Sequence, residues 1–257
     1  MQDTQNTKDN RNIELGEVGV KDVIVPLFIP SRTKKRQFVV ARIKMSVSLT
    51  KDYKGTHMSR FIEVIEYYRN YNFNNYSISQ ILRKLKKRLK ANSAYLEVSF
   101  NYFIKKQSPI SGKKSLMNYE CKIIGQSIKN NKIETFLNVL VPISSVCPCS
   151  KAISKYGAHN QRGVVNLKVK TNKFVWFEDL ISLVEEYGGS GEVYSLLKRK
   201  DEKYLTERMF DNPKFVEDAV RDVAISLKKD KRIMSSSIEC TNYESIHNHN
   251  AYAKITN

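Results

Sequence analysis

The order of strand and helix patterns along the chain limits most sharply the folds that it can adopt. In each half, runs with the two-residue alternation of strands surround runs with the 3.6-residue period of helices, roughly in the order ββααββ. The strand-like runs cover 20–29, 37–50, 93–104, 115–128, 132–144, 163–171, 232–242 and 247–255, and the helical runs cover 58–70, 77–90, 174–188 and 212–229. This order predicts an α+β protein built from antiparallel sheets.

The repeated order also predicts the domain organisation. We expect a flexible polar tail over residues 1–17, a first module over 18–145 and a second module over 146–257. A chain of 257 residues is long enough for two such modules with a real core. No apolar run reaches the roughly 18 residues that a membrane-spanning helix needs, so we expect no membrane partner.

The helix expected over 77–90 has one apolar face and one basic face. Ser77 and Gln80 have the spacing of a capping box. The apolar stripe consists of Ile78, Ile81, Leu82, Leu85 and Leu89, and the basic face carries Arg83, Lys84, Lys86, Lys87, Arg88 and Lys90. A basic face of this kind can bind nucleic acid or phosphate, but a solvated helix surface is the simpler interpretation.

The charge balance favours an anionic partner without identifying it. The chain has 44 Lys and Arg against 26 Asp and Glu, a formal net charge of +18, which suits nucleic acid, anionic lipid or a polyphosphate metabolite. A compositional bias toward Lys, Asn, Ile and Tyr explains the same excess without any function. The N-terminus lacks the apolar core of a secretory signal, so we expect a cytoplasmic protein whose four cysteines are not in disulfides.

Cys147 and Cys149 flank a single proline. No CxxC pair exists to complete four thiolates, which argues against a zinc ribbon. Pro148 favours extended backbone before it, and in an extended chain two thiols at this spacing point to opposite faces. One thiol can then bind a metal while the other faces something else, or one thiol can simply be buried.

Histidines gather in the C-terminal half. His247 and His249 are two positions apart in the strand expected over 247–255, so their rings should share a face, and Glu244 lies three residues before His247. Imidazoles held beside a carboxylate suit metal binding or proton transfer near neutral pH. An exposed polar hairpin is the alternative interpretation.

A helix start is predicted at Asn212 and Pro213, which are residue types favoured at the N-cap and at the first helical position. This start places Glu217 near the end of the first turn. There the helix dipole favours an ionised carboxylate, which only accepts hydrogen bonds. Ordinary complementation of the dipole is the simpler interpretation of Glu217.

Four segments together resemble the signature blocks of the type IB GTP cyclohydrolase family. They are GTHMSRF at 55–61, CPCSKAISKYGAHNQRGVV at 147–165, GEVYSLLKRKDEKYLTERMFDNPKFVEDAVRD at 191–222 and ESIHNHNAYAK at 244–254. The resemblance implies a tunnelling fold of two tandem modules, each an antiparallel sheet with two helices on one face. It also implies homotetramers with active sites between subunits. The implied reaction converts GTP and water to 7,8-dihydroneopterin triphosphate and formate, the first step of tetrahydrofolate biosynthesis.

By motif position, the resemblance assigns one catalytic divalent metal to Cys147, His159 and Glu202. A thiolate, an imidazole and a carboxylate form a borderline ligand set that is compatible with Zn, Mn, Fe or Co. Three protein ligands leave a coordination position open for water, as a catalytic site requires. The metal would lower the pKa of that water toward ~7, so that it attacks carbon 8 of guanine.

The resemblance implies roles for the remaining candidates as well. Glu244, His247 and His249 would transfer protons, and Cys149 would lie close to the reacting carbon. Glu217 would bind guanine, because an ionised carboxylate accepts from both the ring N–H and the exocyclic amine. The residues that would hold the triphosphate are Arg162, Lys198 and Arg199.

The sequence leaves two alternatives open. One is the nitrile reductase of queuosine synthesis, a second tunnelling-fold enzyme, which needs a nicotinamide cofactor and no metal. The other is a nucleic-acid-binding protein that uses the basic helix face and loses affinity steeply with salt. The cysteine, histidine and glutamate set and the block at 244–254 favour the cyclohydrolase, and because nothing in the sequence reads bases we expect no nucleic-acid partner.

Overall fold

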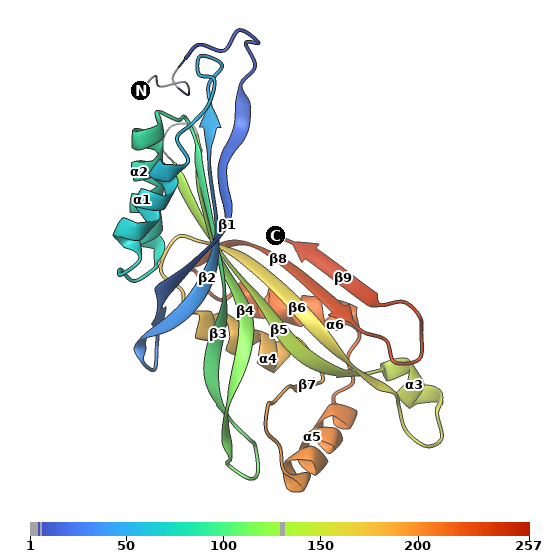
Figure 1. Ribbon diagram of the computed structural model, residues 1–257. Coiled ribbons are helices and arrows are strands. Elements are labelled where there is room, and N and C mark those ends of the chain that lie inside the picture. The colour runs from blue at the N-terminus through green and yellow to red at the C-terminus, as the bar shows by residue number, and fades with distance from the viewer. Residues whose placement is uncertain (1–4, 6, 129–131) are drawn as a thin grey trace. The chain divides into compact units, whose positions relative to one another are not determined.

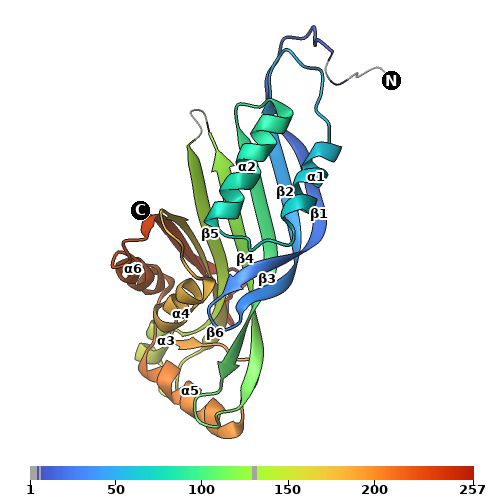
Figure 2. The ribbon, with the colours of Figure 1, turned by 90° about the vertical axis from the view of Figure 1, so that its left-hand side faces the viewer.

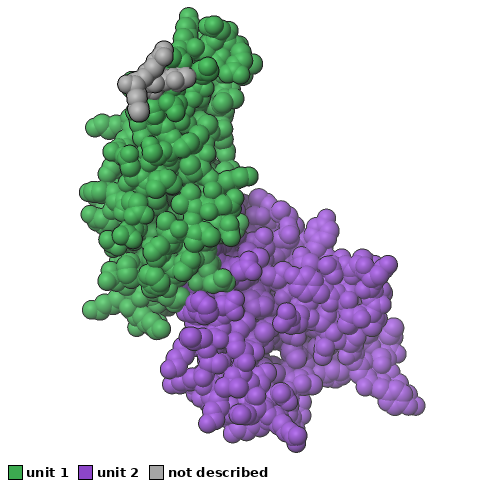
Figure 3. Space-filling view, viewed as in Figure 1, with its two compact units in different colours: residues 1–101, 122–137 green, residues 102–121, 138–257 purple. Residues whose placement is uncertain are grey.

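The structure, a computed structural model, describes residue 5, residues 7–128 and residues 132–257. Within these residues, nine strands form an antiparallel sheet in the order β1-β2-β3-β4-β5-β6-β8-β9, with β7 against β5. The α+β class expected from the sequence is therefore confirmed. The chain divides into two compact units, residues 1–101 with 122–137 and residues 102–121 with 138–257 (Figure 3). This division cuts through long strands, so the predicted module boundary between 145 and 146 stays a prediction.

The first unit is built on a long hairpin of β1 (Leu15–Ser31) and β2 (Lys35–Leu49), in which Ser31 pairs with Lys35 (Figure 1). Val39, Ala41, Ile43 and Met45 of β2 are buried, whereas Val40, Arg42 and Lys44 between them are exposed. This alternation matches the sequence pattern. The first unit also contains helices α1 (Ser59–Tyr68) and α2 (Asn75–Leu89), which pack against each other.

Helix α2 begins two residues before the predicted position. Asn74 is its N-cap and accepts hydrogen bonds from the N–H groups of Tyr76 and Ser77, while the Ser77 hydroxyl accepts from the N–H of Asn74. Ser77 therefore completes the capping box instead of opening it. The predicted apolar stripe is confirmed, since Ile78, Ile81, Leu82 and Leu85 are fully buried. A Cβ at Gly125 of β4 would lie 2.3 Å from Ile78, so only glycine allows this close approach.

Strands β3 (Ala94–Gln107), β4 (Lys114–Ser127) and β5 (Ile133–Val146) are shared by the two units. The elements that follow β5 all belong to the second unit. They are α3 (Pro148–Ile153), β6 (Asn160–Thr171), α4 (Phe177–Tyr187), β7 (Gly191–Glu192), α5 (Arg199–Asp211), α6 (Val216–Leu227), β8 (Ile233–Asn242) and β9 (Ala251–Thr256). Helices α4 and α6 lie on the same side of β6 and β8 (Figures 1 and 2).

The second unit departs from the sequence expectation at two helices. The helix expected from residue 212 begins at Val216, because the chain before it is bonded to the end of β5: Ser145 Oγ donates to the carbonyl of Lys214 at 2.8 Å. Asn212 is instead the C-cap of α5. Helix α5 was not predicted, since its buried residues are only Asp201 and Leu205 and it has no apolar stripe.

The strand expected over 247–255 is also shorter than predicted. β9 starts at Ala251, and residues 243–250 form an irregular loop between β8 and β9. The assignment of His247 and His249 to a strand was therefore wrong. Asn-rich sequence and exposed side chains leave this segment without the alternating burial that holds a strand in a sheet.

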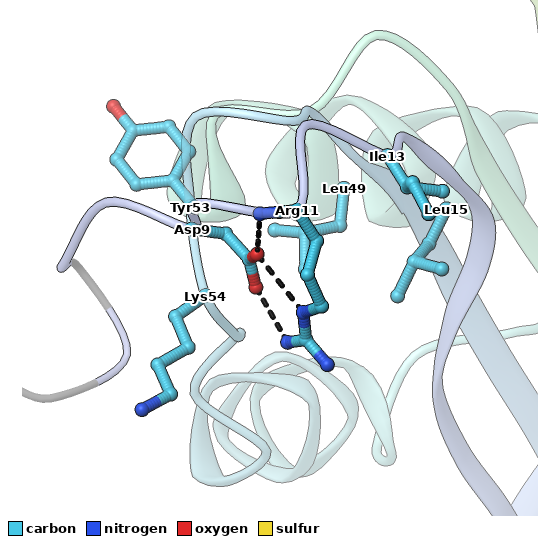
Figure 4. A pocket seen from close by; sticks show the side chains of 7 residues that line it. All are labelled: Asp9, Arg11, Ile13, Leu15, Leu49, Tyr53 and Lys54. Carbon is cyan, nitrogen blue, oxygen red and sulfur yellow. Dashed lines mark hydrogen bonds and ion pairs between the residues drawn. The ribbon is translucent and has the colours of Figure 1, made fainter.

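The predicted tail lies partly outside the described residues, which omit 1–4 and 6. Gln5 and Thr7 accept backbone hydrogen bonds from Gly55 and Lys54, and Leu15 already belongs to β1. In the same region Arg11 and Asp9 form an ion pair beside a small pocket of about 160 Å³ (Figure 4). Among the described helices, none is long and apolar enough to cross a membrane.

Candidate active site

The polypeptide backbone brings Cys147 and His159 side by side. The N–H of Cys147, at the end of β5, donates to the carbonyl of His159 at 3.1 Å, just before β6 begins. Ser150 of α3 fastens both residues, because its hydroxyl donates to the carbonyl of Cys147 at 3.3 Å and accepts from the N–H of His159 at 3.1 Å. Two of the three predicted metal ligands are thus neighbours on an anchored backbone.

The two cysteines differ in conformation. Cys147 is extended and caps α3, and its Sγ accepts from the N–H of Ser150 at 3.5 Å. Pro148 occupies the first helical position, so Cys149 lies in the first turn of α3 with an exposed side chain. The expectation of extended backbone holds for Cys147 and was wrong for Cys149, because proline favours the start of a helix as much as it favours extended chain before it.

The ring of His159 is held by two polar side chains. Its Nδ1 lies 3.0 Å from Oε1 of Gln161 and 3.2 Å from the hydroxyl of Ser245. Nε2 of Gln161 in turn donates to Glu244 at 3.4 Å. His159 and Glu244, two residues singled out from the sequence, are therefore connected through Gln161, a residue that sequence reasoning missed. Strand alternation after His159 is the signal that could have found it.

Glu202 lies in the first turn of α5 with an exposed side chain. Its neighbour Asp201 is fully buried and accepts from the backbone N–H groups of Ile110, Ser111 and Lys198 at 2.7–2.8 Å. Burial alone would raise the pKa of Asp201, but hydrogen bonds from Ser111, Lys198 and Ile110 outweigh burial and lower it. Sequence reasoning also missed Asp201, which ties the start of α5 to the β3–β4 turn.

Glu217 is the second residue of α6 and is exposed, so it lies in the first turn as predicted although the helix starts later. Burial raises the pKa of the Cys240 thiol to about 12, and the nearby charge of Glu217 adds to this rise. Helix α6 packs against β8, the strand that leads into loop 243–250.

Loop 243–250 carries all three predicted proton-transfer residues. Glu244 is half-buried, whereas His247 and His249 are exposed and stack on each other with ring centroids 5.1 Å apart. The base of the loop is fixed to β6, since the N–H of Tyr243 donates to the carbonyl of Arg162 at 2.9 Å. The two histidine rings thus lie side by side, as predicted, but in a loop and not on one face of a strand.

The three candidates for triphosphate binding have exposed side chains. Arg162 belongs to β6, on the face opposite the buried Gln161. Lys198 is the N-cap of α5 and Arg199 is its first residue. All three basic side chains are accessible to an anion.

The described residues contain no group of three or more His, Cys, Asp and Glu side chains that could hold a metal ion. The predicted set of Cys147, His159 and Glu202 is therefore not gathered within one chain. The first two still fit a divalent ion: the thiol is partly exposed, and the partners of Nδ1 leave Nε2 of His159 available as a ligand. A soft thiolate with an imidazole suits a borderline metal.

Comparisons with known proteins agree over the whole chain. A family model described as type I GTP cyclohydrolase FolE2 matches residues 1–253. A GTP cyclohydrolase FolE2 of Syntrophobacter fumaroxidans is 52% identical over 256 residues, which cover 99% of this chain and 98% of that protein. The same comparison gives 50% identity over 255 residues, and 99% of both chains, for GTP cyclohydrolase FolE2 of Syntrophus aciditrophicus.

Solved structures identify the fold. Uricase from Arthrobacter globiformis aligns with a TM-score of 0.55 and 8% identity, over 94% of this chain and 93% of that chain. Urate oxidase from Bacillus subtilis 168 aligns with a TM-score of 0.55 and 9% identity, over 93% and 97%. At sequence identities this low, the alignments show a shared fold and nothing about activity. That fold is the tunnelling fold expected from the sequence. With the family model matched from residue 1 to 253, the chain belongs to the type I GTP cyclohydrolase FolE2 family.

Proposed function

We propose that this chain is a GTP cyclohydrolase that converts GTP and water to 7,8-dihydroneopterin triphosphate and formate, the first step of tetrahydrofolate biosynthesis. The observation that carries the proposal is the identity of 52% to a GTP cyclohydrolase FolE2 over 99% of this chain. Neither a nitrile reductase nor a nucleic-acid-binding protein accounts for a match of this length. The cytoplasmic location expected from the N-terminal sequence stays a prediction.

Cys147, His159 and Glu202 would hold one divalent ion, for which zinc, manganese and iron are the candidates. Such an ion activates water as a nucleophile at neutral pH. The proposal is supported by the contact between the backbones of Cys147 and His159 and by the availability of Nε2 on the His159 ring. Glu202 would complete the set from the first turn of α5.

Guanine would be held by Glu217. Its carboxylate has only acceptor atoms, and guanine presents two neighbouring donors, the ring N–H and the exocyclic amine. Glu217 lies in the first turn of α6, and hydrogen bonds to a carboxylate are stronger than those between neutral groups. The exposed position of Glu217 leaves these acceptor atoms open to a ligand.

Proton transfer during ring opening would fall to Glu244, His247 and His249, with Cys149 beside carbon 8. The two imidazoles stack on each other in loop 243–250, and imidazole is the side chain most often used as a general acid or base. Exposed basic side chains would bind the triphosphate, and these are Arg162, Lys198 and Arg199.

A homotetramer with active sites between subunits would enclose these groups. In the single chain Glu202, Glu217 and both loop histidines are exposed, whereas the proposed chemistry needs a site that excludes bulk water. A second subunit placed over them would provide that exclusion. Light scattering on the purified protein measures the mass directly, and a monomeric enzyme with full activity would contradict this part of the proposal.

The decisive experiment uses GTP labelled with ¹³C at carbon 8. The protein is loaded with Zn²⁺ or Mn²⁺ and incubated with the labelled GTP, and the products are followed by NMR and, after oxidation, by neopterin fluorescence. We expect the label in formate and a fluorescent pterin in equal amounts. Formate without a pterin would mean hydrolysis of the ring alone, and neither product with several divalent ions would refute the proposed function.

A further inference from the structure

The side chain of Gln161 connects two parts of the proposed site that are far apart in the sequence. Gln161 is 7% exposed and lies two residues after His159, with its amide between the His159 ring and the carboxylate of Glu244. Both ends of the amide are therefore in use. A buried glutamine with a polar partner at each end does more than fill space.

The chemistry of these partners fixes the direction of the amide. An ionised carboxylate only accepts hydrogen bonds, so the group that faces Glu244 Oε1 at 3.4 Å is the amide nitrogen. The amide oxygen then faces Nδ1 of His159 at 3.0 Å, and Nδ1 must carry the proton. The remaining ring nitrogen, Nε2, keeps its lone pair.

The loop that carries Glu244 is also attached to the ring. The hydroxyl of Ser245 lies 3.2 Å from Nδ1 of His159. Strands β6 and β8 are paired up to Gly163 and Asn242, directly before this loop, and a Cβ at Gly163 would lie 2.5 Å from the Asn242 side chain. The close pairing holds the base of the loop next to Gln161.

We propose that Gln161 is a positioning residue: it holds the Nδ1 side of the His159 ring, which would leave Nε2 to bind the metal, and through its amide nitrogen it holds Glu244 and loop 243–250 beside that ring. This inference rests on the proposed function, because it takes His159 as a metal ligand and Glu244 as a proton-transfer residue. A partner that orients a ligating histidine through its other nitrogen acts in the way known for the outer shell of metal sites.

Two substitutions separate the two hydrogen bonds. Gln161→Glu keeps an acceptor for the Nδ1–H group but replaces the donor to Glu244 by a second carboxylate oxygen. Gln161→Leu keeps a similar volume and removes both hydrogen bonds. Asn172→Leu, at an exposed amide directly after the end of β6, controls for the change of amide to leucine.

The probe is Co²⁺ added to the metal-free protein, with affinity measured by competition with a chromophoric chelator and geometry read from the visible absorption of the bound ion. We expect Gln161→Leu to bind Co²⁺ about 10- to 100-fold more weakly, with an altered spectrum. Gln161→Glu should keep affinity and spectrum within a few fold, yet lose about 10- to 100-fold in turnover of GTP. Circular dichroism verifies the fold of each variant.

Wild-type Co²⁺ affinity and spectrum in folded Gln161→Leu would overturn the role at His159. Wild-type turnover in Gln161→Glu would overturn the role at Glu244, and this arm decides the matter if the leucine variant does not fold. Failure of the proposed function gives a different pattern, in which wild-type protein binds Co²⁺ but leaves GTP unchanged. Wild-type protein that binds no Co²⁺ would overturn the orientation of His159 toward a metal altogether.

Discussion

Lys106 near the end of β3 is a largely buried cation whose removal should destabilise the second unit. Its ammonium group has three donors, and all three are used: Glu185 Oε1 at 2.7 Å, Glu192 Oε2 at 2.9 Å and the carbonyl of Val193 at 3.0 Å. The side chains of Lys106, Glu185 and Glu192 are 10%, 14% and 20% exposed. A charged group this deeply buried depends on its partners.

Two tyrosines complete this network. The hydroxyl of Tyr119 donates to Glu185 at 2.6 Å, and that of Tyr194 donates to Glu192 at 2.8 Å. Burial, with the neighbouring carboxylates adding to it, raises the pKa of both tyrosines, so they stay protonated donors. Lys106→Met would leave two buried carboxylates with these hydroxyl donors and without the central cation.

Breaking a buried ion pair from one side costs about 3–5 kcal/mol of unfolding free energy. For a protein of this size, 1 kcal/mol shifts the melting temperature by about 2–4 °C, so Lys106→Met should lower Tm by roughly 6–20 °C. Adding Glu185→Gln and Glu192→Gln should recover much of this loss, because neutral amides can remain buried at lower cost. Lys105→Met, at the exposed neighbour, should change Tm little.

The pH dependence gives an independent signature. Burial alone would raise the pKa of Glu192, but Lys106 and the Tyr194 hydroxyl lower it, so the wild type loses this stabilisation only as the pH falls below the ordinary glutamate value of about 4.3. In Lys106→Met the largest lowering influence is gone, so burial should raise the pKa of Glu192 above that value. The folded variant then binds more protons than the unfolded chain, and its stability should rise as the pH falls from 7 to 5.

Thermal and urea unfolding followed by circular dichroism from pH 5 to 8 measures both effects. A Tm of Lys106→Met equal to that of Lys105→Met would refute the reasoning that the cation holds this network together. A large loss of stability without the predicted gain on acidification would assign the effect to packing of the lysine stem.

Three further outcomes are expected from single substitutions. Cys147→Ala should be isolated largely without metal, whereas Cys149→Ala should keep its metal and turn over poorly; elemental analysis of both variants separates the roles, and the reverse pattern would exchange them. Glu217→Gln places a donor against the guanine donors and should weaken GTP binding by about 1.5–3 kcal/mol, measured by calorimetry, with unchanged affinity leaving Glu217 only a dipole partner. Asp201→Asn should lower metal occupancy and GTP turnover, because it loses an acceptor oxygen at the start of α5, the helix that carries Glu202. Full metal occupancy and turnover in Asp201→Glu would show that the carboxylate does not need its exact position.

Periodic burial made much of the fold predictable. The alternation of buried and exposed residues along β2 and the apolar stripe on α2 arise because each element packs one face against the core. Such periodic patterns can be recognised in the sequence. Helix α5 has no apolar stripe: its only buried residues are one leucine, Leu205, and one aspartate, Asp201. Its position is set by hydrogen bonds from the β3–β4 turn, which no local pattern predicts.

The same distinction applies to the site. Cysteine, histidine and glutamate are residue types that often bind metals or transfer protons, and the family resemblance singled out His159 and Glu244 among them. Gln161 carries no such signal, because glutamine is an ordinary polar residue until its partners are known. One of those partners lies 83 residues away along the chain. Residues that orient other residues become visible only with the tertiary contacts.

Within one chain the proposed metal ligands lie on two separately anchored parts of the second unit. Cys147 and His159 lie on backbone joined by β5, α3 and β6, and their positions depend on a backbone hydrogen bond and on two hydrogen bonds through Ser150. Glu202 instead depends on α5, which is fastened through Asp201 to the β3–β4 turn. Loss of the second anchor should therefore leave a two-ligand site with weak metal binding, because the backbones of Cys147 and His159 keep their contact when Glu202 is misplaced.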